Sequence, residues 1–239
     1  HWRTCYFIGG GLGIMLLFLR IGVLESDMFK GIRHADVSKG NFFMFFNDRK
    51  RFRKYLSSIL IGLPTWYVIG ILITFSSEFA QHMGVRGKID PGRAVMFAYA
   101  SISIGDVAVG LLSQRLRSRK KALYIFYGLT AIGIIWFFNL QGQSPGALYA
   151  ACALLGFGTG FWAIFVTMAA EQFGTNIRAT AATTVPNMVR GALNLISLLF
   201  ASLQGALGYV TSGWVTGVVC MLLAVGAALL SEETFGKDL

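Results

Sequence analysis

Hydrophobic residues gather in long runs along the chain, and short polar segments separate the runs. Seven runs are long enough to cross about 30 Å of hydrocarbon as helices. They are Cys5–Leu24, Tyr55–Ser76, Ala94–Leu112, Ala122–Leu140, Gly146–Ala170, Ala179–Leu203 and Thr211–Leu230. A segment alone in lipid must satisfy its own backbone N–H and C=O groups, and the runs lack the alternation of barrel strands. The predicted fold class is therefore an all-α membrane protein with seven transmembrane helices.

The loops differ sharply in their content of Lys and Arg. The predicted first, third and fifth loops are basic, whereas the fourth (Gln141–Pro145) and sixth (Gln204–Val210) have no Lys or Arg. Because basic loops stay in the cytoplasm, this bias places the odd-numbered loops and the C-terminus inside. We expect a multi-pass protein of the cytoplasmic membrane, plasma or inner. With the N-terminus outside, an odd number of helices is expected to precede His1, so the chain is expected to be truncated at its N-terminus.

Within the first loop, residues 41–55 read NFFMFFNDRKRFRKY, an aromatic patch followed by a basic run. Such a stretch is typical of the bilayer interface, where rings enter the headgroups and basic side chains meet anionic lipid. A solvated basic loop that leads into the next helix is the alternative, and both stay open. The expected organisation is a helix in residues 1–24, a cytoplasmic loop in 25–54, a six-helix transport domain in 55–230 and a cytoplasmic tail in 231–239.

Composition narrows the class further. The chain is 55% hydrophobic and 13% charged, whereas a soluble domain carries roughly 25% charge. The net charge of +10 does not indicate nucleic-acid binding, because the basic residues lie between apolar runs. Cys5, Cys152 and Cys220 lie inside apolar runs, and neither metal-ligand spacing nor a cofactor motif occurs. We expect no metal, no cofactor and no nucleic-acid partner.

Two predicted helices carry polar stripes with spacings of 4, 3, 4 and 3 residues, which is one face of an α-helix. The stripes are Tyr99, Ser103, Asp106, Gly110 and Ser113 in the third helix, and Thr183, Asn187, Arg190, Asn194 and Ser197 in the sixth. A charged residue in mid-membrane costs about 2.5–3.5 kcal/mol, so each stripe must face protein or water. For the Ser and Thr positions we favour a role in helix–helix packing. For Asp106 and Arg190 we favour a functional role.

Asp106 and Arg190 lie on the second helix of each consecutive trio, as an inverted repeat of three plus three helices predicts. Two explanations remain open. The two side chains neutralise each other across a protein-lined gap, or Asp106 carries a proton while Arg190 holds an anionic substrate.

Two other helices contain aromatic residues beside helix-breaking residues. Trp66 and Tyr67 follow Pro64, and Trp162 follows the glycine-rich stretch Gly156–Gly160. Gly and Pro at matching positions of two repeats mark unwound, substrate-facing helix in transporters. Close packing at glycines is the alternative.

The third loop carries the most specific motif. The segment Gly110–Lys120, GLLSQRLRSRK, resembles the cytoplasmic loop signature of the major facilitator superfamily at Gly110, Arg115, Arg119 and Lys120. Gln114 replaces the acid of that signature and Arg117 replaces its second glycine. Glu171 to Arg178 resembles the junction of the family's helices ten and eleven. Residues 2–26 resemble helix six and its exit in sugar and metabolite symporters, and residues 232–239 are similar to the stretch after helix twelve in sugar porters. The resemblance covers essentially the whole chain.

The resemblance implies that the seven helices are helices six to twelve of a twelve-helix transporter. The last six would form a 3+3 inverted-repeat bundle, half of the family's fold, beside a missing N-terminal half. It also implies that Glu171, Arg178, Arg115 and Arg119 form salt bridges that hold an outward-facing state. The alternative for these charges is ordinary interfacial pairing, worth about 0–1 kcal/mol. Since helices eight and eleven face the N-terminal half, Asp106 or Arg190 would alternatively pair across that interface.

These observations predict part of a secondary active transporter, and no enzyme. It would move a small organic solute, such as a sugar or an organic anion, by alternating access and with proton coupling. A drug or metabolite efflux antiporter of the same superfamily is the main alternative. A seven-helix receptor of the rhodopsin type would need a Lys in the last helix, and Thr211–Leu230 has none. A membrane enzyme would need clustered His, Asp or Glu near an interface, and the sequence shows no such cluster.

Overall fold

A computed structural model describes residues 2–21 and 40–236, and every regular element in these residues is helical. Within them, seven helical segments are long and apolar enough to cross a membrane. The all-α fold with seven spanning helices is thus confirmed. The chain divides into two units, residues 1–38 and 39–239, which are described separately.

The first unit contains α1 (Trp2–Ile21), whose 20 residues include a membrane-length apolar window. The helix begins before the expected Cys5, and the expected end at Leu24 falls outside the described residues. Half of the predicted first loop, residues 25–39, also lies outside them, as do the last three residues of the predicted tail.

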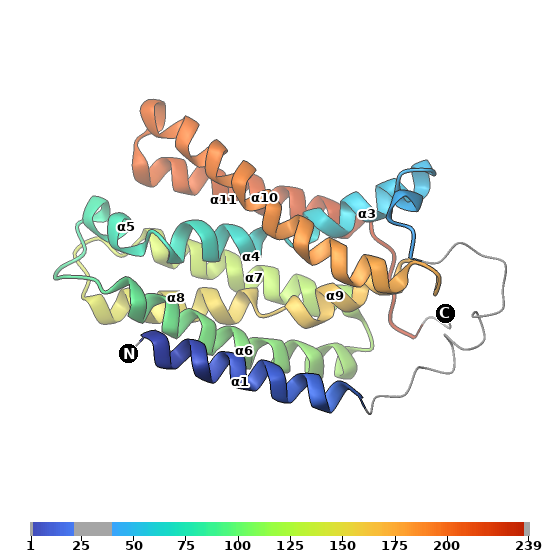
Figure 1. Ribbon diagram of the computed structural model, residues 1–239. Helices are drawn as coiled ribbons and strands as arrows, with labels where there is room; N and C mark the ends of the chain where they lie inside the picture. The colour runs from blue at the N-terminus through green and yellow to red at the C-terminus, as the bar shows by residue number, and fades with distance from the viewer. Residues whose placement is uncertain (1, 22–39, 237–239) are drawn as a thin grey trace. The chain divides into compact units, whose positions relative to one another are not determined.

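The second unit is a bundle of antiparallel spans (Figure 1). Its elements in order are η1 (Phe42–Phe45), α3 (Arg49–Ile61), α4 (Leu63–Tyr67), η2 (Val68–Ile73), α5 (Ser76–Met83), α6 (Pro91–Leu116), α7 (Arg119–Phe138), α8 (Pro145–Thr159), α9 (Trp162–Glu171), α10 (Arg178–Leu207) and α11 (Tyr209–Leu230). The start of α3, the α6–α7 and α9–α10 turns and the end of α11 share one end of the bundle. We call it the basic end, because the predicted basic loops lie there (Figure 1).

Several helices begin at a polar capping residue that precedes the apolar run. Asp48 accepts the N–H of Lys50 and starts α3 at Arg49, six residues before the predicted Tyr55. Asp90, Ser118 and Ser144 cap α6, α7 and α8 in the same way. A cap satisfies N–H groups at a helix start and needs no apolar residue. The predicted bounds were therefore too narrow by a few residues at several helix starts.

Two spans are interrupted inside the segments that contain Pro64 and the glycines. In the first, α3 ends at Ile61, Pro64 lies in the first turn of α4, and a π-helical turn follows at Val68–Ile73. In the other, α8 ends at Thr159 and α9 begins at Trp162. These are the first spans of the two trios, so the interruptions occupy equivalent places in the repeat.

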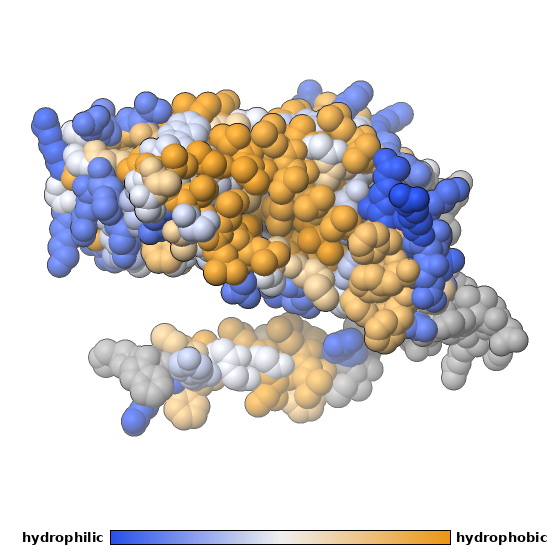
Figure 2. All heavy atoms as spheres, turned by 90° about the horizontal axis from the view of Figure 1, so that it is seen from above, coloured by the Kyte–Doolittle hydropathy of each residue, from blue (hydrophilic) through white to orange (hydrophobic). Residues whose placement is uncertain are grey.

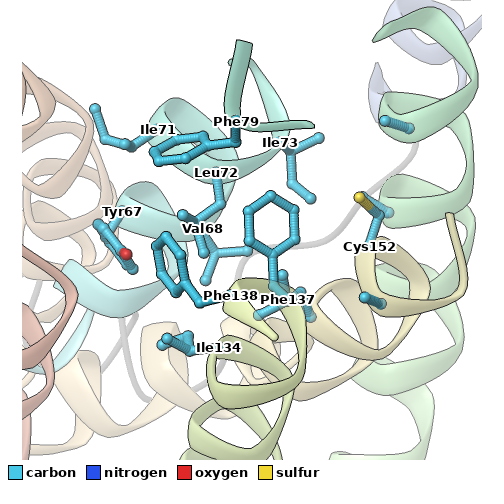
Figure 3. Close-up of a cluster of buried hydrophobic side chains, with 14 of the residues drawn as sticks. Tyr67, Val68, Ile71, Leu72, Ile73, Phe79, Ile134, Phe137, Phe138 and Cys152 are labelled. Atoms are coloured by element: carbon cyan, nitrogen blue, oxygen red, sulfur yellow. The ribbon is translucent and has the colours of Figure 1, made fainter. Parts of the chain in front are cut away.

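The short helix α5 was not expected, since the predicted second run ends at Ser76 and the third begins at Ala94, which left residues 77–93 as a loop. Phe79, Ala80 and Met83 are buried on one side of α5, and Gly84 ends the helix with φ +70°. Phe79 lies with Phe137 and Phe138 in the core cluster around Tyr67, Val68 and Leu72 (Figure 3). An eight-residue amphipathic helix is too short to produce an apolar run.

The close approach of α6 and α8 depends on glycine. A Cβ on Gly156 would lie 2.2 Å from Ala98 O, and one on Gly105 would lie 2.5 Å from Phe157 O. Both atoms belong to backbone, which cannot move aside as a flexible side chain can. Small residues let helices in membranes pack backbone to backbone. On the side of the bundle shown in Figure 2, apolar side chains cover the middle and polar ones cover both ends, as a spanning protein requires.

Candidate functional site

A cavity of about 180 Å³ lies where the interrupted spans meet the two polar stripes. Its walls come from α4, η2, α6, α8, α9 and α10. The lining residues are Thr65, Trp66, Ile69, Tyr99, Ile102, Asp106, Thr159, Trp162 and Arg190. Sequence segments as distant as Trp66 and Arg190 thus form one wall.

The cavity brings together five of the eight residues predicted for the substrate and proton pathway, namely Asp106, Arg190, Tyr99, Trp66 and Trp162. The other three do not line it. Tyr67 is fully buried and its hydroxyl donates to Gly213 O at 2.7 Å, which places it in the core against α11 (Figure 3). Asn187 is exposed and donates to Thr183 O at 2.9 Å within α10. Asn194 is also exposed on α10.

Asp106 contacts the start of α9. The N–H of Ala163 donates to Asp106 Oδ1 at 3.0 Å. Phe161, which precedes α9, supplies no side-chain cap, so the carboxylate from α6 takes that place. The first N–H groups of a helix lack intrahelical partners and carry partial positive charge, which an anion satisfies. Asp106 therefore joins α6 to the interruption between α8 and α9.

Arg190 is exposed on α10 and has different neighbours. Its Cζ lies 5.7 Å from the centroid of the Trp66 ring, and its Nη1 donates to Asn187 Oδ1 at 3.4 Å. A guanidinium over a Trp face gains cation–π attraction and keeps its charge. In the described part of the chain, no carboxylate lies within ion-pair distance of Arg190, Asp106 included. The two charges share a cavity without pairing.

Hydrogen-bond donors without partners also border the cavity. Among the described residues, Trp66 Nε1 and Thr65 Oγ1 are buried and find no hydrogen-bond partner. Thr65 is only 3% exposed. A buried donor without a partner costs about 1–3 kcal/mol. Together with the guanidinium of Arg190, these groups suit a ligand that offers acceptor atoms.

Four lining residues, Thr65, Ile69, Ile102 and Thr159, were not predicted as site residues. Thr65 and Thr159 lie in the two segments that contain Pro64 and the glycines. A Thr beside a helix-breaking residue inside an apolar run could therefore have indicated a site residue. Ile69 and Ile102 give no signal, because an apolar residue in an apolar run says nothing about which neighbour it faces.

A pair of opposite charges joins α7 to α9 at the basic end. Arg119 Nη2 lies 2.8 Å from Glu171 Oε1, and Arg119 Nε lies 2.9 Å from Glu171 Oε2. Only 16% of each side chain is exposed. Two parallel N–H···O bonds fix the orientation of the pair as well as its distance. The pair connects the first residue of α7 to the last residue of α9.

Glu233, which was not predicted, lies beside this pair. Its carboxylate accepts hydrogen bonds from Ser118 Oγ and from the N–H groups of Arg119, Lys120 and Phe235. Burial pushes the pKa of Glu233 upward, but these hydrogen bonds outweigh it and hold the pKa below its ordinary value. Lys120 Nζ donates to Ser231 O at 2.8 Å. The segment after α11 is thereby attached to the start of α7.

The remaining predicted gate residues do not join the Arg119–Glu171 pair. Arg115 is exposed and makes no ion pair among the described residues. Arg178 is half-buried, and its Nε and Nη2 find no hydrogen-bond partner in the described residues. At Gly110, a Cβ would meet nothing within 4 Å. Among the described residues, no group of three or more His, Cys, Asp or Glu is placed to hold a metal ion.

Comparison with known protein families gives one finding. The family model described as Major Facilitator Superfamily matches residues 1–197, which include α1, the cavity residues and the third-loop motif. The search of curated proteins gives no match.

Proposed function

Because the chain belongs to the major facilitator superfamily, we propose that it moves a small organic anion across the cytoplasmic membrane, with the Asp106–Arg190 cavity as its binding site. It is a multi-pass membrane protein of a transporter family. One observation carries the proposal. Arg190 presents a guanidinium without a carboxylate partner among the described residues, in a cavity that also contains unpartnered donors.

The chemistry of the cavity favours an anion over a neutral solute. A carboxylate or phosphate offers the acceptor oxygens that Arg190, Trp66 and Thr65 require, and the planar guanidinium suits bidentate recognition. The volume of about 180 Å³ lies below the roughly 300–1,000 Å³ of pockets that hold drug-sized ligands. The solute is therefore small.

Asp106 supports coupling to protons. A bound anion and an ionised Asp106 would repel each other within one cavity, so the anion favours the protonated form. The start of α9 favours the ionised form, because its N–H groups accept negative charge. Arrival of the anion thus promotes proton uptake, and its departure promotes proton release. Coupled movement of the anion and the proton in one direction is proton symport.

Alternating access requires contacts that form in one state and break in another. We assign this role to the basic-end cluster, in which Arg119 and Glu171 form the pair and Arg115 and Arg178 remain available to a partner. That partner is the N-terminal half of the transporter, against which α6 and α10 would pack. Gly110, at which a Cβ would meet nothing within 4 Å, leaves its face of α6 open to that half, and Lys120 holds the start of α7 to Ser231 after α11.

Uptake by the full transporter in proteoliposomes tests the anion assignment. An inward proton gradient should drive accumulation of small carboxylates. We expect Arg190→Gln to abolish this uptake and Arg190→Lys to raise KM about tenfold, because the ammonium keeps the charge but loses the planar fork. Arg86→Gln is the matched control, since Arg86 is exposed at the opposite end of the bundle. Carboxylate uptake that survives Arg190→Gln would contradict the proposal.

A neutral sugar is the second candidate solute. The rings of Trp66 and Trp162 lie 6.3 Å apart at 75° and both line the cavity, so they offer apolar faces to a sugar. The same assay separates the two, because sugar uptake would survive Arg190→Gln. Reversing the proton gradient separates symport from an efflux antiporter.

A further inference from the structure

A second cavity, of about 490 Å³, lies at the basic end between the start of α3, the end of α9 and the end of α11. Lys50, Arg53 and Lys54 line one side, and Gln172, Leu230 and Glu232 are among the residues opposite. We propose that this cavity binds the anionic headgroup of a phospholipid. The proposal concerns a different site from the transport cavity and does not depend on the transported solute.

Charge in this cavity is unbalanced. Lys54 Nζ lies 3.5 Å from Glu232 Oε1, which offsets one of the three positive charges. The side chains of Lys50 and Arg53 make no ion pair within the described part of the chain. Gln172 Nε2 is buried and finds no hydrogen-bond partner among the described residues. The cavity therefore combines two uncompensated cations with an unsatisfied donor, which suits phosphate oxygens.

The depth of the cavity places it among lipid headgroups. Lys50, Arg53 and Lys54 occupy the first two turns of the span Arg49–Ile73, and Leu230 is the last residue of the span Tyr209–Leu230. Figure 1 shows these two helix ends at the same end of the bundle. The ends of spanning helices lie where hydrocarbon gives way to headgroups.

An apolar side chain in the cavity favours a lipid over a soluble anion. Leu230 lines the cavity and is 63% exposed. A free phosphate would gain nothing from this apolar surface. A phospholipid would contact it with its glycerol and acyl groups while its phosphate met Lys50 and Arg53.

Thermal unfolding of the purified protein tests this site. The protein in neutral detergent is titrated with short-chain phosphatidylglycerol or with short-chain phosphatidylcholine, and the unfolding midpoint is followed by tryptophan fluorescence. We expect the anionic lipid alone to raise the midpoint in a saturable way. In Lys50→Gln/Arg53→Gln, the apparent Kd should rise about 30-fold, because each basic residue contributes about 1 kcal/mol to the binding of an anionic lipid.

The control variant is Arg115→Gln/Lys121→Gln, which removes two exposed charges at the same end of the bundle but outside the cavity. It should keep the wild-type Kd. Equal weakening in both variants would overturn the proposal, as would equal stabilisation by phosphatidylcholine. If inorganic phosphate alone reproduced the full effect, the lipid assignment would be wrong. Should the double variant fail to fold, Lys50→Gln and Arg53→Gln are tested singly, and an unchanged Kd in both would overturn the proposal.

Discussion

Replacement of Asp106 separates the contact that this side chain makes with α9 from the proton transfer that we propose for it. Its carboxylate accepts the N–H of Ala163 at the start of α9, and it also lines the cavity that contains Arg190. Asn at this position keeps an acceptor oxygen but cannot carry a proton. Ala removes both the acceptor and the proton. A series of Asp106→Asn and Asp106→Ala therefore distinguishes helix capping from proton transfer.

The expected loss of stability follows from the cap. Loss of a side-chain cap costs about 0.5–2 kcal/mol, typically about 1 kcal/mol. Asp106→Ala should therefore destabilise the protein by about 1 kcal/mol. Asn caps about as well as Asp, and it loses only the attraction of a negative charge to the helix start, about 0.3–1 kcal/mol. Asp106→Asn should be the milder change.

Two measurements on the full transporter read out the two roles. Thermal unfolding in detergent reports the cap, and uptake into proteoliposomes reports transport. We expect Asp106→Asn to keep a midpoint close to wild type, to lose accumulation driven by a proton gradient and to retain solute exchange. Asp106→Ala should have a lower midpoint and should lose accumulation as well.

Each role has its own refuting result. Accumulation at the wild-type level in Asp106→Asn would exclude Asp106 as the proton carrier. A wild-type midpoint in Asp106→Ala would show that the contact with α9 contributes nothing to stability. Loss of both exchange and accumulation in a well-folded Asp106→Asn would favour a structural role for the charge over proton transfer.

Three further predictions concern packing and the basic end. Gly156→Ala should lower the unfolding midpoint strongly, because its Cβ would lie 2.2 Å from Ala98 O. Gly128→Ala is the control and should keep the midpoint or raise it slightly, because its Cβ would meet nothing within 4 Å. Equal midpoints in the two variants would contradict this packing. Glu171→Gln should cut uptake severely while insertion stays normal, because the charge-assisted pair is lost, and unchanged uptake would exclude a gate. Glu233→Gln should lower the midpoint at neutral pH, because its lowered pKa means that folding favours the carboxylate. This stabilisation is complete well above pH 4.5 and is lost as the pH falls through the lowered pKa. A midpoint difference that does not shrink as the pH is lowered below 4.5 would refute it.

The apolar runs alone determined the fold class. A run such as Thr211–Leu230 has one stable solution in hydrocarbon, because only a helix satisfies its backbone groups there. The third-loop motif and the polar stripes likewise indicated the family and two candidate residues, Asp106 and Arg190. The amphipathic helix α5 escaped prediction, because its buried positions are few and its burial depends on Phe137 and Phe138 of a distant helix.

Only the tertiary structure decided which groups meet. Periodicity shows which face of a helix is polar, but it does not show which helix lies opposite that face. Asp106 thus faces the start of α9, where an interrupted helix exposes N–H groups, and Arg190 lies over Trp66. Tyr67 follows Trp66 in the sequence, but successive side chains of an α-helix point in different directions, because the helix has 3.6 residues per turn. Tyr67 therefore points into the core against Gly213.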